Sequence, residues 1–157
     1  MPTRGGRHRK GRALVVGPSA LLLVVVAGAC AGDLDGAIQV RGVDYSFQGV
    51  PERLGAGRHR FSFENHSDDE QHEMVILRVN DGVGEPLRRV LELPEAEAMK
   101  KVTQVGVTEA PPGEKAKADV SGELRKGRYA MVCFVPVGGR EGPPHFRRGM
   151  IQEFAVD

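Results

Sequence analysis

The segment "GRYAMVCFVPVGGREGPPHFRRGMIQEFAV", residues 127–156, decides the fold. Two apolar runs rich in strand-forming residues flank a loop of glycines and prolines, which predicts two β-strands joined by a long connection. The segment also holds Cys133, His145 and Met150. Soft metal ions prefer thiolate, imidazole and thioether ligands. The three residues therefore predict either a metal site or, on the simpler interpretation, a core thiol, a loop imidazole and a core thioether.

Alternating apolar and polar residues continue the strand pattern upstream. Residues 43–47 (VDYSF) and 58–65 (RHRFSFEN) alternate with a period of two, and 72–79 (HEMVILRV) is a more uniformly apolar strand. A further strand is expected near 117–121. Residues 85–102 have helix-forming residues at helical spacing, interrupted by a proline. This order predicts an all-β fold, an antiparallel Greek-key β-sandwich of roughly seven strands with a short helical insert.

The N-terminal region predicts export. Five basic residues and no acid precede an apolar run from Ala13 to Ala29, which is followed by Cys30. This order is typical of a signal segment. We expect a signal peptide at 1–29, a tether at 30–36 and the folded domain at 37–157. The small residues before Cys30 resemble the lipobox of bacterial lipoproteins, with Ala27 where that family usually has a larger residue.

The resemblance implies that Cys30 becomes the lipid-carrying N-terminus. The alternative is an uncleaved membrane helix, since the apolar run has the length of a short span. Either way the domain is expected outside the cytoplasm and tethered to the cell membrane, and the lipoprotein interpretation makes the anchor a lipid. With Cys30 modified, Cys133 has no disulfide partner, so an unpaired thiol in an oxidising compartment needs a function.

Composition excludes one large class of partner. Without residues 1–29 the chain keeps 17 of its 22 basic residues and all 21 acidic ones, a net charge of about −4. Nucleic-acid binding needs a basic face, which this composition does not offer. No phosphate-binding loop, serine-nucleophile motif or Cys-x-x-Cys pair is present in the sequence. A nucleophilic Cys133–His145 pair is conceivable, but a cysteine within a core strand argues against it, and we expect no enzyme.

Histidines near the start of the 72–79 strand complete a ligand set. His66 and His72 are available there, and either of them, together with His145, Cys133 and Met150, gives the His2Cys set with a weak axial Met that blue-copper sites use. His66 is interpreted as a surface-loop histidine. The acidic residues Asp68, Asp69 and Glu70 are interpreted as a solvated loop without a metal role, and His8 and His59 are discounted.

The segments "FSFEN", "HEMVIL", "GRYAMVC", "PHFRRGM" and "IQEFAV" resemble the cupredoxins, small copper proteins of the plastocyanin and azurin type. The resemblance covers the chain from about Gly42 onward, apart from the helical insert. It implies that His72, Cys133, His145 and Met150 bind one type 1 copper ion, that Asn65 is the asparagine preceding the first ligand, and that the protein transfers single electrons to an unidentified redox or surface partner.

One departure keeps two other functions open. Eleven residues, Phe134 to Pro144, separate Cys133 from His145, where plastocyanin-type proteins have only a few. The glycines and prolines of this loop permit it to fold back on itself. The alternatives are a metal-free cupredoxin-like interaction module and a copper transfer or storage protein. The metal-free alternative predicts imidazoles more than roughly 5–6 Å from the Cys133 sulfur, too far to share an ion.

Overall fold

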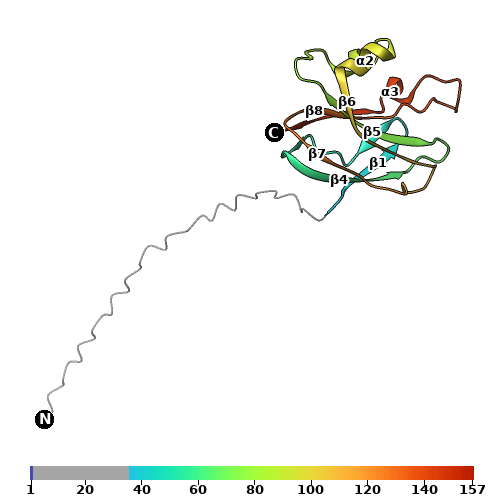
Figure 1. Ribbon diagram of the computed structural model, residues 1–157. Coiled ribbons are helices and arrows are strands. Elements are labelled where there is room, and N and C mark those ends of the chain that lie inside the picture. Colours follow the sequence, from blue (N-terminus) through green and yellow to red (C-terminus); the bar gives the residue numbers. More distant parts are fainter. Residues whose placement is uncertain (2–35) are drawn as a thin grey trace. The chain divides into compact units, whose positions relative to one another are not determined.

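Two β-sheets pack face to face in the computed structural model, which describes residue 1 and residues 36–157 (Figure 1). The strands are β1 (Ile38–Val43), β2 (Ser46–Gln48), β3 (Arg53–Leu54), β4 (Gly57–Asn65), β5 (His72–Val79), β6 (Val102–Ala110), β7 (Val120–Leu124), β8 (Gly127–Val132) and β9 (Ile151–Val156). The helices are α1 (Leu87–Val90), α2 (Glu95–Lys101) and α3 (His145–Arg148). The predicted β-sandwich with a short helical insert is confirmed.

The sheets are mixed rather than fully antiparallel. One sheet has the order β2-β1-β4-β7 and the other β3-β9-β8-β5-β6. Most neighbours are antiparallel, but β1 runs parallel to β4 and β3 runs parallel to β9. Parallel neighbours need a crossover connection, and here the chain leaves the first sheet after β2 and forms β3 in the second sheet before returning as β4. This excursion corrects the expectation of a purely antiparallel sandwich.

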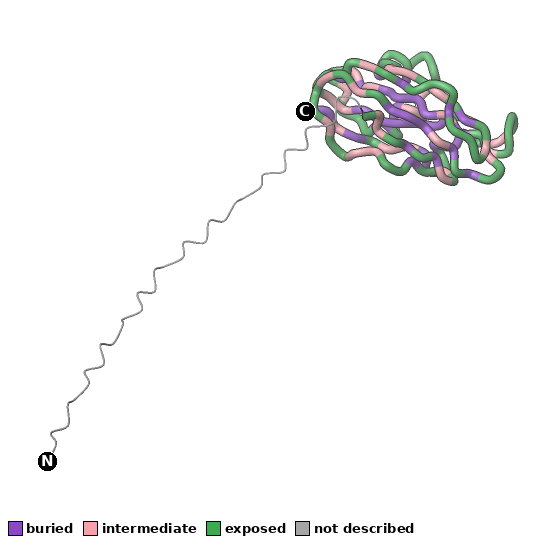
Figure 2. Tube along the Cα trace, turned by 90° about the horizontal axis from the view of Figure 1, so that it is seen from below, coloured by how far each residue is buried: buried purple, intermediate pink, exposed green. Residues whose placement is uncertain are grey.

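The core between the sheets follows from alternation along β4 and β8. Phe61 and Phe63 on β4 face Tyr129 and Met131 on β8, and each of the four is at most 1% exposed. Cys133, next in the same alternation, belongs to this core as well. Figure 2 shows the buried stretches gathered in the middle of the domain, with exposed stretches mostly around its edge. The period of two seen in the sequence is thus the inner face of the sandwich.

A second apolar core covers the outer face of the five-stranded sheet. The alternate residues of β8, Ala130 and Val132, pack there with Leu87, Val90 and other residues of the helical segments. In Figure 1, α2 and α3 both lie on this side of the five-stranded sheet. The predicted helical segment is interrupted at Pro94, which is the N-cap residue of α2, a place where a proline removes no hydrogen bond of the helix. The last four residues of β8, from Tyr129 to Val132, are apolar on both faces because both faces are buried there.

The segment 43–47 is a hairpin turn and not the continuous strand expected from its alternation. Strand β1 ends at Val43, Tyr45 adopts a positive φ of 63°, and β2 pairs back on β1 from Ser46. Asp44 is a residue type that favours turns, but the aromatic residues around it masked that signal. The strand expected near 117–121 is β7, three residues later.

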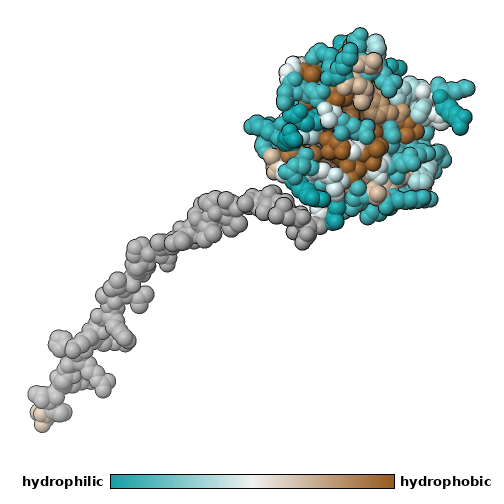
Figure 3. All heavy atoms as spheres, in the orientation of Figure 1, coloured by the Kyte–Doolittle hydropathy of each residue, from teal (hydrophilic) through white to brown (hydrophobic). Residues whose placement is uncertain are grey.

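The described surface is mainly hydrophilic. Figure 3 shows hydrophilic side chains surrounding a hydrophobic area in the middle of the visible face. In the described residues of the folded domain, the large apolar side chains that remain exposed are those of Met99, Val107 and Phe134. Within those same residues, no helix is both long and apolar enough to cross a bilayer. The predicted signal peptide, and Cys30 with it, lies outside the described residues apart from Met1.

We expect Tyr129→Phe to destabilise the domain by about 1–3 kcal/mol, because it removes two part-buried hydrogen bonds to the backbone of Arg125, each with a net worth of about 0.5–1.5 kcal/mol. The Tyr129 hydroxyl donates to the Arg125 carbonyl at 2.8 Å and accepts from the Arg125 amide at 3.0 Å. The ring itself stacks on Phe154 at 5.5 Å and would be kept. Urea unfolding of both proteins measures the difference, and an unchanged midpoint would show that the hydroxyl contributes nothing.

Candidate metal centre

The predicted ligands meet at one end of the sandwich because β5 and β8 are antiparallel neighbours. Residue 75 pairs with residue 132, so the beginning of β5 lies beside the end of β8. His72 is the first residue of β5 and Cys133 directly follows β8. His145 is the first residue of the single turn α3, a regular element where a loop was expected.

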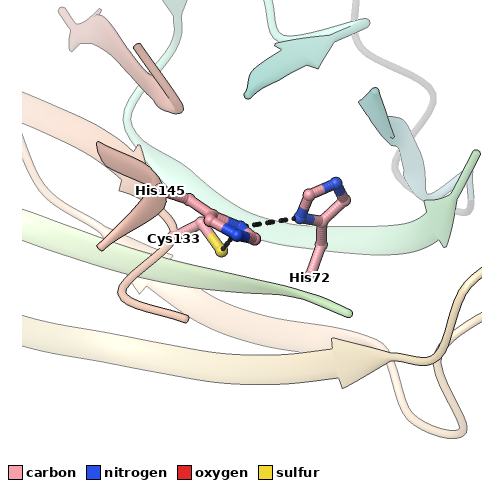
Figure 4. Close-up of side chains that lie close together, drawn as sticks. All are labelled: His72, Cys133 and His145. Atoms are coloured by element: carbon pink, nitrogen blue, oxygen red, sulfur yellow. Dashed lines mark hydrogen bonds between the residues drawn. The ribbon is translucent and has the colours of Figure 1, made fainter. Parts of the chain in front are cut away.

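The two imidazoles and the thiol converge on one point (Figure 4). His145 lies between the other two residues, with its Nδ1 atom 3.0 Å from His72 Nδ1 and 3.4 Å from Cys133 Sγ. The candidate ligand atoms of the three residues all lie within 4.8 Å of one another. The metal-free alternative predicted that the imidazoles lie more than roughly 5–6 Å from the Cys133 sulfur, and this prediction is wrong.

All three side chains are completely buried, and burial sets their protonation in the absence of metal. Desolvation raises the pKa of the Cys133 thiol to about 11, although hydrogen bonds from the backbone amides of Glu73 and Val135 partly oppose it. Desolvation likewise lowers the pKa of His72, with His145 adding to the effect, and lowers the pKa of His145. The metal-free site thus holds a neutral thiol and neutral imidazoles at pH 7.

Asn65 fixes the loop that leads to His72. Its side-chain amide donates to the carbonyls of Glu70 at 2.8 Å and Ala110 at 3.0 Å, and its Oδ1 accepts the Ser67 amide at 2.9 Å. The asparagine is 2% exposed, so these bonds satisfy a buried polar group while tying β4 to the connection before β5. Asn65 therefore holds in place the segment that leads into the first histidine.

The long connection between Cys133 and His145 folds back on itself, as its glycines and prolines permit. Pro136 and Pro144 form an antiparallel bridge, and the Val137 amide donates to the Pro143 carbonyl at 3.0 Å. The turn uses positive φ angles at Gly138 and Gly139, 66° and 99°. At its base the His145 amide donates to the carbonyl of Val135 at 2.9 Å. The eleven residues thus form a closed tongue, defined here as residues 134–144.

Met150 is completely buried in the same core as Cys133. Its backbone joins the other two late residues of the set, since its carbonyl accepts the Cys133 amide at 3.2 Å and its amide donates to the His145 carbonyl at 3.1 Å. It directly precedes β9, which was expected to begin with it. Its backbone thus lies beside Cys133 and His145, and its role as axial ligand stays a prediction.

The remaining histidines of the domain lie outside the cluster. His66 is exposed, with its Nε2 3.3 Å from a Glu64 oxygen, and His59 contacts the Gly55 carbonyl. Glu70 is a residue that the sequence interpretation assigned to a solvated loop without a metal role. Its carboxylate is not one of the clustered ligands but lies 3.5 Å from His145 Nε2. An acid that follows two other acids in a polar loop gives no sequence signal for such a contact.

Comparison with known proteins identifies the fold. No protein-family model matches the chain, and no curated protein is significantly similar to it in sequence. Among solved structures, sodium-dithionite-reduced auracyanin from Roseiflexus castenholzii is 17% identical with a TM-score of 0.51, over 78% of this chain and 99% of that one. Auracyanin A, described as a "blue" copper protein from Chloroflexus aurantiacus, is 19% identical with a TM-score of 0.50, over 78% and 98%. The domain has a cupredoxin-like fold.

The metal-free domain is expected to lose stability as the pH falls below 6.5. Because burial holds the folded-state pKa of His72 and His145 below the ordinary 6.5, the unfolded state binds more protons in this range. The stabilisation is complete above pH 6.5 and is lost as the pH falls through the folded-state values. Urea midpoints at pH 7.5, 6.5 and 5.5 measure it, and His72→Gln should flatten the dependence. An equal slope in that variant would contradict the assignment.

Proposed function

We propose that the domain binds one type 1 copper ion and carries single electrons outside the cytoplasm. The observation that supports this best is the convergence of His72, Cys133 and His145 at a completely buried point. Two imidazoles and a thiolate are the trigonal donor set of blue-copper sites, and Met150 supplies a thioether in the same core. The cupredoxin-like fold supports the proposal independently.

The residues present fit such an ion. First-row metals bind histidine nitrogen and cysteine sulfur at about 2.0–2.3 Å. His72 Nδ1 and Cys133 Sγ lie 3.0 Å and 3.4 Å from His145 Nδ1, so the three residues are close enough together to hold one such ion. In the described part of the chain, Nε2 of His72 and of His145 make no hydrogen bond. Ligation through Nδ1 would leave the proton on Nε2 of each ring.

Bound copper would supply a centre that exchanges one electron. The chain would hold the ligands at fixed positions and keep water away from them. Cys133 accepts a hydrogen bond from the Glu73 amide at 3.5 Å, which stabilises a thiolate. Burial of the three ligands excludes water, and the sheets fix their spacing. A site held in one geometry needs little rearrangement when its charge changes, which suits an electron carrier.

A catalytic role for the Cys133–His145 pair is not proposed. The contact of 3.4 Å between sulfur and imidazole resembles that of a nucleophile and its base. However, Cys133 is 0% exposed and burial raises its pKa to about 11, so no substrate reaches a thiolate there. We propose a carrier and not an enzyme.

Tethering to the outer face of the cytoplasmic membrane completes the proposal. The basic head, apolar run and Cys30 support a lipid anchor, with the residues after Cys30 as the tether. A tethered carrier meets its redox partner on the same membrane, where the partner is a protein that gives or takes one electron.

Copper loading tests the electron-carrier function. We expect the purified domain with Cu(II) to develop an intense blue or green colour from thiolate-to-copper charge transfer. Cys133→Ala should lose the colour completely, because it removes the thiolate. His66→Gln is the matched control, since it removes a histidine that lies outside the cluster. Visible absorption and electron paramagnetic resonance spectra measure the outcome.

Two results would contradict the proposed electron-carrier function in different ways. A colourless wild-type protein that retains no copper would leave the metal-free interaction module. A colourless protein that binds Cu(I) tightly and cannot be oxidised reversibly would indicate copper transfer or storage. Reversible oxidation and reduction of the coloured form separates the carrier from both.

Cys30→Ser is expected to abolish lipid attachment and the cleavage that depends on it. Several acyl chains give lasting anchorage, whereas one binds only marginally, so the wild type should stay in the membrane fraction. Membrane fractionation and intact mass measure both effects. A mature wild-type protein that begins elsewhere, or lacks the lipid mass, would rule out the lipoprotein interpretation and leave the copper proposal intact.

A further inference from the structure

The Glu70 carboxylate contacts three separate segments around the metal centre. Its Oε1 accepts the Gly138 amide of the tongue at 3.1 Å, with Oε2 at 3.4 Å. The Tyr45 hydroxyl donates to Oε1 at 3.4 Å. Oε2 lies 3.5 Å from His145 Nε2. One side chain therefore joins the β1–β2 turn, the tongue and the second histidine.

The backbone of Glu70 is itself held in place. Its carbonyl accepts the Asn65 side-chain amide at 2.8 Å, and its amide donates to Ser67 Oγ at 3.2 Å. The side chain is 22% exposed, so its contacts are made in a partly dry environment. A carboxylate fixed at both its backbone and its oxygens can impose an orientation on the group it contacts.

The contact with His145 matters because of which nitrogen it concerns. The Nδ1 atom of His145 faces His72 and Cys133, and Figure 4 shows both contacts as dashed lines. Its Nε2 atom faces Glu70. When Nδ1 binds a metal, the ring proton must reside on Nε2, which becomes a donor toward the carboxylate. Tyr45 packs edge-on against the same ring at 5.1 Å and limits its tilt. Ligating histidines commonly donate their second N–H to a carboxylate that sets the ring orientation.

We propose that Glu70 is a positioning residue for the metal site: Glu70 orients His145 and fastens the tongue to the site. The proposal rests on the copper-binding function above and adds a residue outside the ligand set. It also accounts for the long connection: eleven residues between two ligands are compatible with a fixed geometry when an outside group, bonded to the tongue at Gly138, also contacts the second ligand.

Three variants separate positioning from general folding. Glu70→Ala removes all three contacts, and Glu70→Gln keeps an acceptor oxygen of similar size without the charge. Asp69→Asn is the matched control, because it removes one negative charge from the neighbouring exposed position. The readouts are Cu(I) affinity by competition with a chromophoric chelator, the visible spectrum of the Cu(II) form, and hydrogen exchange of the Gly138 amide in the metal-free protein.

Glu70→Ala should lower copper affinity by about 10–100-fold, the usual effect of losing such a partner, and shift the charge-transfer band. It should also speed exchange of the Gly138 amide at least tenfold, roughly the loss of one net hydrogen bond. Glu70→Gln should fall between it and the wild type, and Asp69→Asn should match the wild type throughout. If Glu70→Ala unfolds, Glu70→Gln decides by the same readouts.

Two failures remain distinguishable. A wild type that takes up no copper would refute the proposed function, and the positioning role would fall with it. A blue wild type whose Glu70 variants keep its affinity, spectrum and amide exchange would overturn the positioning role alone. Equal changes in Asp69→Asn would also overturn it, because they would show a general charge effect.

Discussion

Backbone pairing between β5 and β8 is the constraint on which the metal centre depends. The register that sets Val75 opposite Val132 brings the first residue of one strand beside the residue that follows the other. A slip of one residue would turn every side chain of a strand to the opposite face, exchanging the two apolar cores and moving the thiol out of the site. Because both faces of β8 are buried, such a slip is strongly disfavoured. The hydrophobic cores thereby fix the position of the cysteine.

In this protein, the length of the tongue and the spacing of the two ligands at its ends are set by different contacts. A short loop would set both at once. In a short connection the loop's own length holds the ligands together. Here the internal bonds between Val137 and Pro143, and between His145 and Val135, close the loop at its base. The residues beyond that closure do not need to span the distance from thiol to imidazole. The length of the connection is then independent of the geometry of the site, which explains how eleven residues are tolerated.

Local patterns in the sequence predicted most of the fold, and tertiary contacts decided the rest. The apolar run from Tyr129 to Phe134 correctly predicted a strand with apolar residues on both faces, but no local pattern showed that the helical segments cover the second face. The apolar run that begins at His72 predicted that this histidine starts a strand. Its meeting with the late residues was predicted because the first and last parts of the chain can meet at one end of a sandwich. The hairpin at Asp44 was missed because aromatic neighbours imitate a strand. Glu70 was missed because its contacts come from segments far away in the sequence, which no local pattern reports.

The helical cover on the five-stranded sheet has a consequence for sequence divergence. The last four residues of β8 each belong to one core or the other, so a substitution at any position from Tyr129 to Val132 disturbs packing whichever way its side chain points. The four-stranded sheet presents exposed residues on its outer face, as Arg58 and Arg60 do on β4. Variation among descendants of this chain should therefore accumulate on the four-stranded sheet, while the strand leading to the thiol stays nearly fixed. The two halves of the sandwich should drift at different rates.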